Sequence, residues 1–218
     1  MEHWKHINSF LAVILLFGIT ITLTAQDFLP IKLPEPQTDG GRPLMEVLKD
    51  RKSVRSFKSD TLSLQVLSDL CWAAFGINRP ESGRRTAPSA RNRQEIDVYV
   101  ALQKGLFLYD ALTHQLNPIT KQDLRGYTGR QPFVGEAPLN LIFVADLEKM
   151  GEGSEETKIP WANADTGFIS ENVYLFCASE GLGTVVRGMV DRDDLAPLMK
   201  LREGQRIILA QTVGYPKE

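Results

Sequence analysis

Two arginines, a lysine and a serine stand close together at Arg51, Lys52, Ser53 and Arg55. The guanidinium group of arginine offers a planar fork of N–H donors that matches phosphate oxygens, and a hydroxyl between two arginines can supply a further hydrogen bond. The cluster follows an apolar helical pattern, and cations are also favoured at the C-terminal end of a helix because of its dipole. The spacing therefore indicates either a phosphate-binding segment or simply a charged helix end.

A second polar segment contains Pro88, Ser89, Ala90 and Asn92 and precedes the alternating apolar pattern of a strand. Serine and asparagine side chains can hydrogen-bond a ligand, but proline, serine and asparagine are also ordinary turn formers. Arg91 and Arg93 are interleaved with these residues, either as further phosphate ligands or as solvated charges.

With these two segments in this order, the chain resembles the FMN-dependent nitroreductase superfamily. Its members carry an Arg-x-Ser-x-Arg/Lys segment after the first long helix and a later Pro-Ser-x-x-Asn-x-Gln loop. The resemblance continues through residues 131–134, 181–184 and 213–216, and so covers nearly the whole chain after the N-terminal segment. The hairpin with Tyr109 and His114 is most similar to the branch that contains azoline-oxidising dehydrogenases of peptide natural-product biosynthesis.

This resemblance implies an α+β fold with a mainly antiparallel central sheet flanked by helices, in an intertwined homodimer that binds FMN at its interface. It assigns Arg51 and Ser53 to the phosphate and ribityl oxygens and Arg55 to the pyrimidine edge of the flavin ring, with Lys52 contributing mainly its backbone. A cation at that edge would stabilise the negative charge of the reduced ring.

The resemblance also assigns Pro88, Ser89, Ala90 and Asn92 to the flavin held by the neighbouring subunit.

The stretch that includes Val186, Arg187 and Gly188 corresponds to the backbone that faces flavin N5 in the family. Gly188 suits a close approach of backbone to a ring. The role of Arg187 stays open between phosphate, substrate carboxylate and surface. Many relatives continue past the final Gly-Tyr-Pro with basic residues, whereas this chain ends at Glu218, so Arg187 or Arg91 is the expected replacement.

The expected function is an FMN-dependent oxidoreductase that passes hydride by a ping-pong cycle to an electron-poor acceptor, a nitroaromatic or a quinone. No catalytic side chain is required. One alternative is a flavin-dependent dehydrogenase of a small or peptide-like substrate, with Tyr109 or Lys104 handling a proton. The other is a non-catalytic, flavin-holding exported module.

Composition restricts the other function classes. The chain has 218 residues, 43% of them hydrophobic, which suits one globular domain. Its formal net charge of −2 gives no basic surface of the kind that nucleic-acid binding usually requires. After residue 25 the only histidine is His114 and the only cysteines are Cys71 and Cys177, which argues against a zinc site. Both cysteines lie in apolar helical patterns and are expected to be buried thiols.

Residues 1–25 are predicted to be a secretory signal peptide, because an apolar run follows Lys5 and ends at Thr24 and Ala25. A retained membrane anchor is the alternative, since the run is near the lower length limit for spanning a bilayer. Either way the domain is expected to be exported, periplasmic or anchored facing the periplasm. Residues 26–43 contain four prolines and two adjacent glycines and predict a linker or extended arm rather than a packed element.

The flavin domain is expected over residues 44–218. The predicted elements are a short helix up to Arg51, a helix over 64–75 with Thr61 and Ser63 as cap candidates, a strand over 96–102, a hairpin over 105–119, a strand over 139–145, a mobile loop over 148–158, a long helix over 161–177, a helix over 193–201 and a strand over 207–213.

Overall fold

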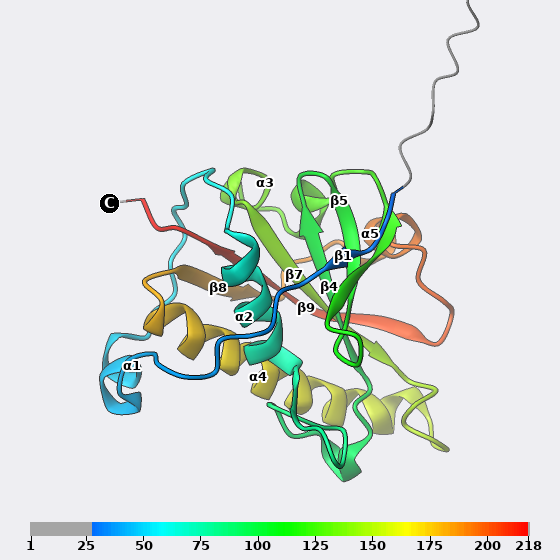
Figure 1. Ribbon diagram of the computed structural model, residues 1–218. Helices are drawn as coiled ribbons and strands as arrows, with labels where there is room; N and C mark the ends of the chain where they lie inside the picture. Colours follow the sequence, from blue (N-terminus) through cyan, green and yellow to red (C-terminus); the bar gives the residue numbers. More distant parts are fainter. Residues whose placement is uncertain (1–27, 218) are drawn as a thin grey trace, which may run out of the picture.

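A seven-stranded antiparallel sheet forms the centre of the structure, a computed structural model that describes residues 28–217 (Figure 1). Its strand order is β1-β6-β5-β4-β7-β9-β8, and β2 pairs with β3 in a separate ribbon. The strands are β1 (Ile31–Lys32), β2 (Ile77–Arg79), β3 (Arg84–Arg85), β4 (Ile96–Leu102), β5 (Gly105–Asp110), β6 (Gln115–Thr120), β7 (Leu139–Asp146), β8 (Gly183–Arg187) and β9 (Gln205–Gly214).

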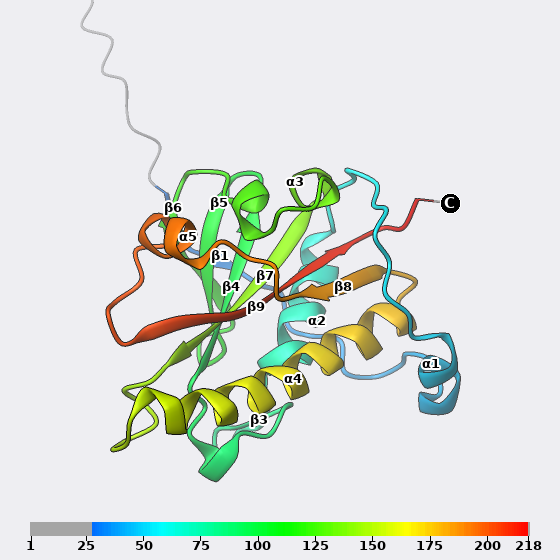
Figure 2. The ribbon, with the colours of Figure 1, turned by 180° about the vertical axis from the view of Figure 1, so that it is seen from behind.

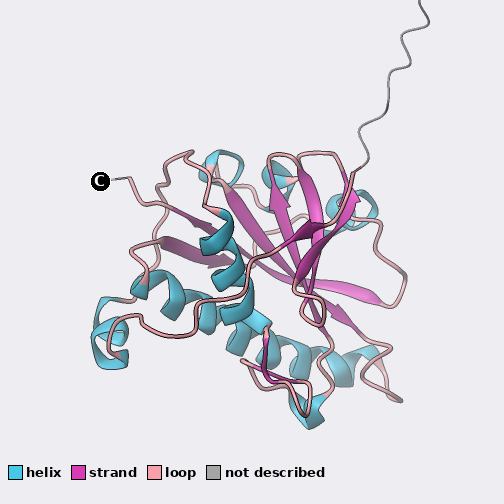
Figure 3. Ribbon diagram, in the orientation of Figure 1, coloured by secondary structure: helices cyan, strands magenta, loops and turns pink. Residues whose placement is uncertain are grey.

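Helices pack on both faces of the sheet (Figure 3). The predicted α+β class with a mainly antiparallel sheet is confirmed. The helices are α1 (Leu44–Asp50), α2 (Leu64–Phe75), α3 (Phe133–Glu136), α4 (Glu155–Ser179) and α5 (Arg192–Leu198), with 3-10 turns η1 (Ala90–Asn92) and η2 (Arg125–Thr128).

Strand β7 shows why the core has two halves. All eight of its residues are buried, because both faces of the sheet are covered at its centre. Leu141 and Phe143 join the cluster formed with α2 and α4, whereas Ile142 and Val144 join the cluster formed with α5. This alternation is the period of two expected of a strand.

Several predicted boundaries agree with the structure. Helix α2 spans Leu64–Phe75, and the Ser63 hydroxyl accepts the Val66 amide at 3.2 Å as a cap. Strand β4 and the β5–β6 hairpin lie where the alternation placed them. Cys71 and Cys177 are free and buried, as expected, and burial raises the pKa of both thiols.

Two expectations about loops need correction. The segment 26–43 is extended but is packed over part of its length: β1 pairs with β6, and Leu33 is buried. The loop predicted over 148–158 is shorter, because α4 begins at Glu155 after the helix-capping position Ser154. The predicted signal peptide at residues 1–25 lies outside the described residues.

The apolar residues that recur at helical spacing along α4 belong only partly to the core. Ile169, Val173 and Cys177 are buried, but Trp161 and Phe168 are 56% and 49% exposed. Their spacing of seven residues puts both on one side of α4, so this helix has an apolar side that the single chain does not cover.

Candidate active site

The Arg51–Arg55 segment leaves the end of α1 and runs beside β8 and the C-terminal residues (Figure 2). The Val54 amide donates to the Thr184 carbonyl at 2.9 Å, and Phe57 forms a β-bridge with Pro216. These contacts anchor the segment through its backbone. Its polar side chains are therefore left available for a ligand.

Tyr174 of α4 joins two of the predicted flavin segments. Its hydroxyl accepts the Val186 amide at 3.0 Å and lies 2.8 Å from the Ser53 hydroxyl. The guanidinium of Arg51 lies over the Tyr174 ring, 5.1 Å from its centroid. Tyr174 is 6% exposed, so it serves as a fixed support for Arg51, Ser53 and Val186. The sequence analysis did not identify this residue.

The donor set of this segment fits a phosphate. Lys52, Ser53 and Arg55 are exposed and Arg51 is half-buried, so their donors face outward. Lys52 and Tyr174 line a cavity of about 350 Å³ that also borders Thr184 of β8. Three cationic side chains and a hydroxyl in one short segment match the charge and hydrogen-bond acceptors of a phosphate. Of these four residues only Lys52 lines the cavity, together with the acidic Asp50.

The Pro88–Asn92 loop lies near the beginning of α4 and has an unusual backbone. Arg91, Asn92 and Gln94 all have positive φ angles, of 58°, 56° and 50°. Such conformations cost of order 1 kcal/mol each in residues other than glycine. They are held by hydrogen bonds that include Gln94 N–H to the Ser89 hydroxyl at 2.9 Å, and the Asn92 amide to the Ser89 carbonyl at 2.9 Å.

A buried carboxyl pair supports this loop. Asp165 of α4 accepts the Ala90 amide at 2.8 Å and is 2% exposed. Glu95 is fully buried, and both of its carboxyl oxygens lack a hydrogen-bond donor. Burial, followed by the hydrogen bond with Asp165, raises the pKa of Glu95 to about 7. A protonated Glu95 that donates to Asp165 pairs one of its two oxygens and avoids two adjacent negative charges in this buried site.

One chain holds the two predicted flavin segments at different points of α4. Ser53 contacts Tyr174, whereas Ala90 contacts Asp165, nine residues earlier in the helix. At 1.5 Å per residue these points are about 14 Å apart along the helix axis. The fold therefore does not bring Arg51 and Ser53 together with the Pro88–Asn92 loop within one chain.

The third predicted segment forms the end of β8. The Val186 amide is already bonded to Tyr174, and Gly188 is exposed just beyond the strand. A Cβ built at Gly188 would meet only Leu209, at 3.7 Å, so packing within the chain does not require glycine there. An approaching ring remains a prediction for this position.

Arg187 requires a correction. It is 5% exposed, and its guanidinium donates to Thr128, to Asn140 Oδ1 at 2.9 Å and to Thr212 Oγ1 at 3.2 Å. Burial lowers the pKa of Arg187 to about 10. A surface role for Arg187 is therefore wrong. Its donors face the protein interior instead of an external phosphate, because β8 directs the guanidinium against Gly129, where there is no room even for a Cβ atom.

A hydrogen-bonded chain connects Tyr109, His114 and Ser68 to the N-terminal arm. His114 Nδ1 lies 3.0 Å from the Tyr109 hydroxyl, and Nε2 lies 2.6 Å from the Ser68 hydroxyl, which donates to the Pro34 carbonyl at 2.5 Å. Because Ser68 uses its proton on Pro34, the neutral histidine donates from Nε2 and accepts from Tyr109. Tyr109 is 7% exposed and committed to this chain, so it is not a proton donor at an open site.

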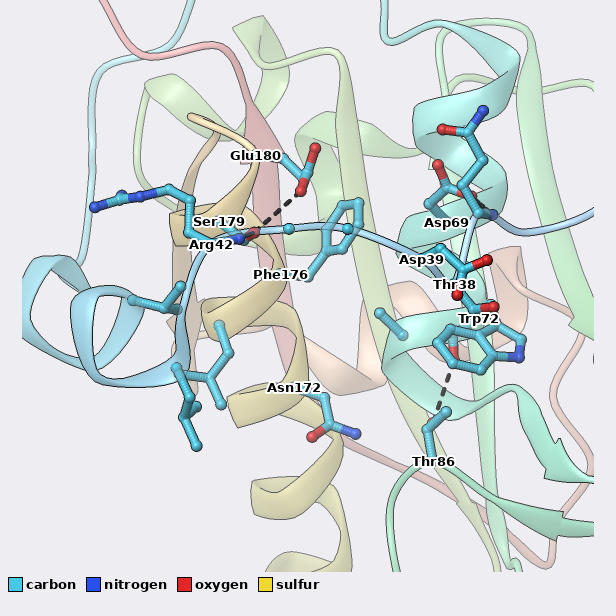
Figure 4. A pocket seen from close by; sticks show the side chains of 17 residues that line it. Thr38, Asp39, Arg42, Asp69, Trp72, Thr86, Asn172, Phe176, Ser179 and Glu180 are labelled. Atoms are coloured by element: carbon cyan, nitrogen blue, oxygen red, sulfur yellow. Dashed lines mark hydrogen bonds between the residues drawn. The ribbon is translucent and has the colours of Figure 1, made fainter.

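A further cavity of about 450 Å³ lies between residues 37–42, α2 and α4 (Figure 4). Trp72, Phe176 and Asn172 point toward it from the two helices, and Arg42, Ser179 and Glu180 lie at one end. None of the predicted flavin residues lines this cavity. It is separate from the Arg51–Arg55 segment.

Comparison with known proteins decides the family. The sequence profile of the nitroreductase family matches residues 48–215. The chain belongs to the nitroreductase family. It is accordingly an oxidoreductase of the FMN-dependent nitroreductase superfamily, as the sequence analysis expected.

Relatives of known sequence or structure agree with this membership. The crystal structure of a proposed nitroreductase from Ralstonia eutropha JMP134 shares 47% identity and a TM-score of 0.83, over 87% of this chain and 90% of that one. A proposed nitroreductase of Methanocaldococcus jannaschii is 28% identical over 187 residues, which are 81% of this chain and 92% of the relative. The E. coli microcin synthetase complex has the same fold in one chain, with 19% identity and a TM-score of 0.69.

The part of the chain between residues 28 and 217 contains no helix with the length and hydropathy needed to cross a membrane. It also contains no group of three or more histidine, cysteine or acidic side chains placed to hold a metal ion.

Proposed function

We propose that this nitroreductase-family chain binds FMN at the Arg51–Arg55 segment and passes hydride by a ping-pong cycle to an electron-poor acceptor, a nitroaromatic or a quinone. The observation that carries the proposal is the convergence of Arg51, Ser53 and Val186 on Tyr174. Two segments that the family resemblance assigns to one flavin, the Arg51–Arg55 segment and the end of β8, meet at this single buried side chain.

Each residue has a definable part in this proposal. Arg51 and Ser53 hold the phosphate and ribityl oxygens, and Lys52, whose side chain lines the neighbouring cavity, contributes mainly its backbone. Arg55 lies at the pyrimidine edge and stabilises negative charge there. Bound FMN itself supplies the acceptance and donation of hydride, so no side chain of this protein has to take part in bond making.

The site is proposed to be completed in a homodimer by Pro88, Ser89, Ala90 and Asn92 of the second copy. Two observations support this. The two flavin segments contact α4 about 14 Å apart in one chain. Phe168 of α4 is 49% exposed, as an aromatic side chain covered by a second copy would be in the isolated chain.

Replacing both Arg51 and Ser53 by alanine tests the flavin site. We expect the variant to lose bound FMN while keeping its far-ultraviolet circular dichroism and a cooperative thermal transition, because neither side chain belongs to the core. The readout is flavin absorbance after desalting. The matched control replaces exposed Ser82 and Arg84 by alanine. Full flavin occupancy in the Arg51/Ser53 variant would place the phosphate elsewhere.

Sedimentation velocity at micromolar concentration tests the dimer. We expect no stable monomer in the wild type. Replacing Phe168 by glutamate is expected to produce monomers that no longer retain FMN. A wild-type monomer that retains FMN contradicts the two-chain site.

Two alternatives and the export of the domain are tested by simple measurements. A flavin-holding module would bind FMN, and dithionite would bleach it, but no donor and acceptor pair would turn over. A dehydrogenase would reduce its flavin with a small or peptide-like substrate. The burial of Tyr109 removes one of its two proposed proton-handling groups and leaves the exposed Lys104.

Export by residues 1–25 is inferred from their sequence alone, and fractionation of cells that express the full chain tests it.

A further inference from the structure

A cationic cavity adjoins the Pro88–Asn92 loop. It has a volume of about 430 Å³ and lies between this loop and the beginning of α4. Its lining includes Arg91, Arg93, Lys158 and Trp161, with Glu152 as the only acidic side chain. The lining therefore carries a net charge of +2, although the whole chain carries −2. Such a contrast attracts anions to this part of the surface.

The charges of this cavity are free to bind a ligand. Within residues 28–217, neither the Arg91 nor the Arg93 guanidinium has a hydrogen bond or salt bridge to another side chain or to the backbone. Lys158 donates one hydrogen bond, to the Leu147 carbonyl at 3.0 Å, which leaves two of its three donors. Arginines whose guanidinium donors have no hydrogen-bond partner within the chain suit a carboxylate or sulfonate.

The backbone presents Arg91 in a fixed, strained conformation. Its φ angle of 58° is followed by a second left-handed residue, Asn92. The Ala90 amide is held by the buried Asp165, so the loop cannot relax without breaking that hydrogen bond. Strain of this kind persists where the surrounding structure over-determines it, commonly at ligand-binding sites.

Trp161 adds an aromatic surface. The indole is 56% exposed although it lines the cavity, so its ring is available for stacking. A planar ring that carries a negative charge would meet both the arginines and this indole. We infer that this cavity selects planar anions, aromatic carboxylates or sulfonates, as the electron acceptors of the enzyme.

The inference rests on the proposed function, because the cavity shares Ala90 with the loop that is proposed to contact the flavin of the second copy. The inference specifies that the electron acceptor is an anion, whereas the proposed function does not specify the acceptor's charge.

Matched acceptors test it: 4-nitrobenzoate is an anion, and 4-nitrobenzamide has the same ring and nitro group without the charge. The holoenzyme is reduced with dithionite, and the rate constant of flavin reoxidation is measured for each acceptor by stopped flow. We expect the wild type to prefer the anion about tenfold or more at low salt, as charge-assisted hydrogen bonds imply. Added salt should reduce this preference.

Replacing Arg91 and Arg93 by glutamine should abolish the preference, so that 4-nitrobenzoate and 4-nitrobenzamide reoxidise the flavin at equal rates. The matched control is Arg84→Gln, an exposed arginine outside the cavity. Equal rates for the two acceptors in the wild type overturn the inference without affecting the proposed function. Loss of FMN from the Arg91/Arg93 variant also overturns it, because these arginines would then be flavin ligands.

A binding measurement separates the inference from turnover. Benzoate, which cannot be reduced, should compete with the quenching of tryptophan fluorescence by 4-nitrobenzoate, and Trp161→Phe should remove most of this quenching. If benzoate competes with 4-nitrobenzoate in a protein that binds no flavin, the anion site is supported and only the proposed function is refuted. Absence of competition at low salt would refute the anion site.

Discussion

The hydroxyl of Tyr174 lies 2.8 Å from the hydroxyl of Ser53 and also accepts the Val186 amide. Tyr174→Phe would remove both hydrogen bonds and keep the ring beneath Arg51. We expect about 1 kcal/mol lower free energy of unfolding and a several-fold weaker affinity for FMN, because Ser53 loses its orientation. Denaturant unfolding and flavin fluorescence titration measure the two effects. Tyr127→Phe, at a side chain that is 49% exposed, is the control. Unchanged FMN affinity would show that Tyr174 has only a structural role.

Arg55 is exposed and placed by family resemblance at the flavin edge. Arg55→Gln should make reduction of bound flavin harder, because a cation that stabilises negative charge is removed. A loss of about 1 to 3 kcal/mol lowers a two-electron potential by tens of millivolts. Arg55→Lys should keep most of the effect. A dye-equilibrated redox titration compares the variants. If Arg55→Gln has the reduction potential of the wild type, Arg55 does not lie at the flavin ring.

Glu95 predicts a pH dependence of stability. Its pKa is raised to about 7 in the folded state from an ordinary 4.5, chiefly by burial and next by Asp165, while Arg93 opposes the shift. The folded state therefore binds the proton more tightly, so its contribution is complete below about pH 4.5 and is lost as the pH rises through 7. The loss amounts to about 3 kcal/mol at 1.36 kcal/mol per pKa unit.

Glu95→Gln, which resembles the protonated carboxyl group, should flatten this dependence. Urea unfolding between pH 5 and 8 measures it, with exposed Glu81→Gln as control. An unchanged slope in Glu95→Gln would mean that Glu95 is ionised in the folded protein.

His114 predicts a dependence of opposite sign at the N-terminal arm. Burial lowers the pKa of His114, so the folded state binds its proton less tightly than the unfolded state. Its contribution is present above the ordinary pKa of about 6.5 and is lost as the pH falls below it. Protonation of Nδ1 removes the acceptor of the Tyr109 hydroxyl.

We expect faster hydrogen exchange at the Leu33 amide, which donates to the His114 carbonyl, at pH 5.5 than at pH 7.5 after correction for intrinsic rates. His114→Gln should remove this difference. The same acceleration in the variant would assign it to another group.

Local pattern and family motifs predicted much of this protein. The alternation in 96–102 and the helical repeat in 64–75 specify their elements because each period matches one buried face, and Ser63 marks the helix start through its side-chain oxygen. The motifs around Arg51, Ser53 and the Pro88–Asn92 loop predicted membership of the nitroreductase family, and the match over residues 48–215 confirms this membership.

Tertiary structure decided the properties that depend on distant partners. Arginine is usually a surface residue, but β8 directs the Arg187 side chain into the interior, where it bonds Thr128, Asn140 and Thr212. No local sequence pattern reveals these partners. Trp161 and Phe168 follow a helical repeat typical of core, yet they are exposed because burial depends on what packs against the helix. Tyr174 and Asp165 hold the two proposed flavin segments only because α4 passes both, through contacts more than 70 residues apart in the sequence.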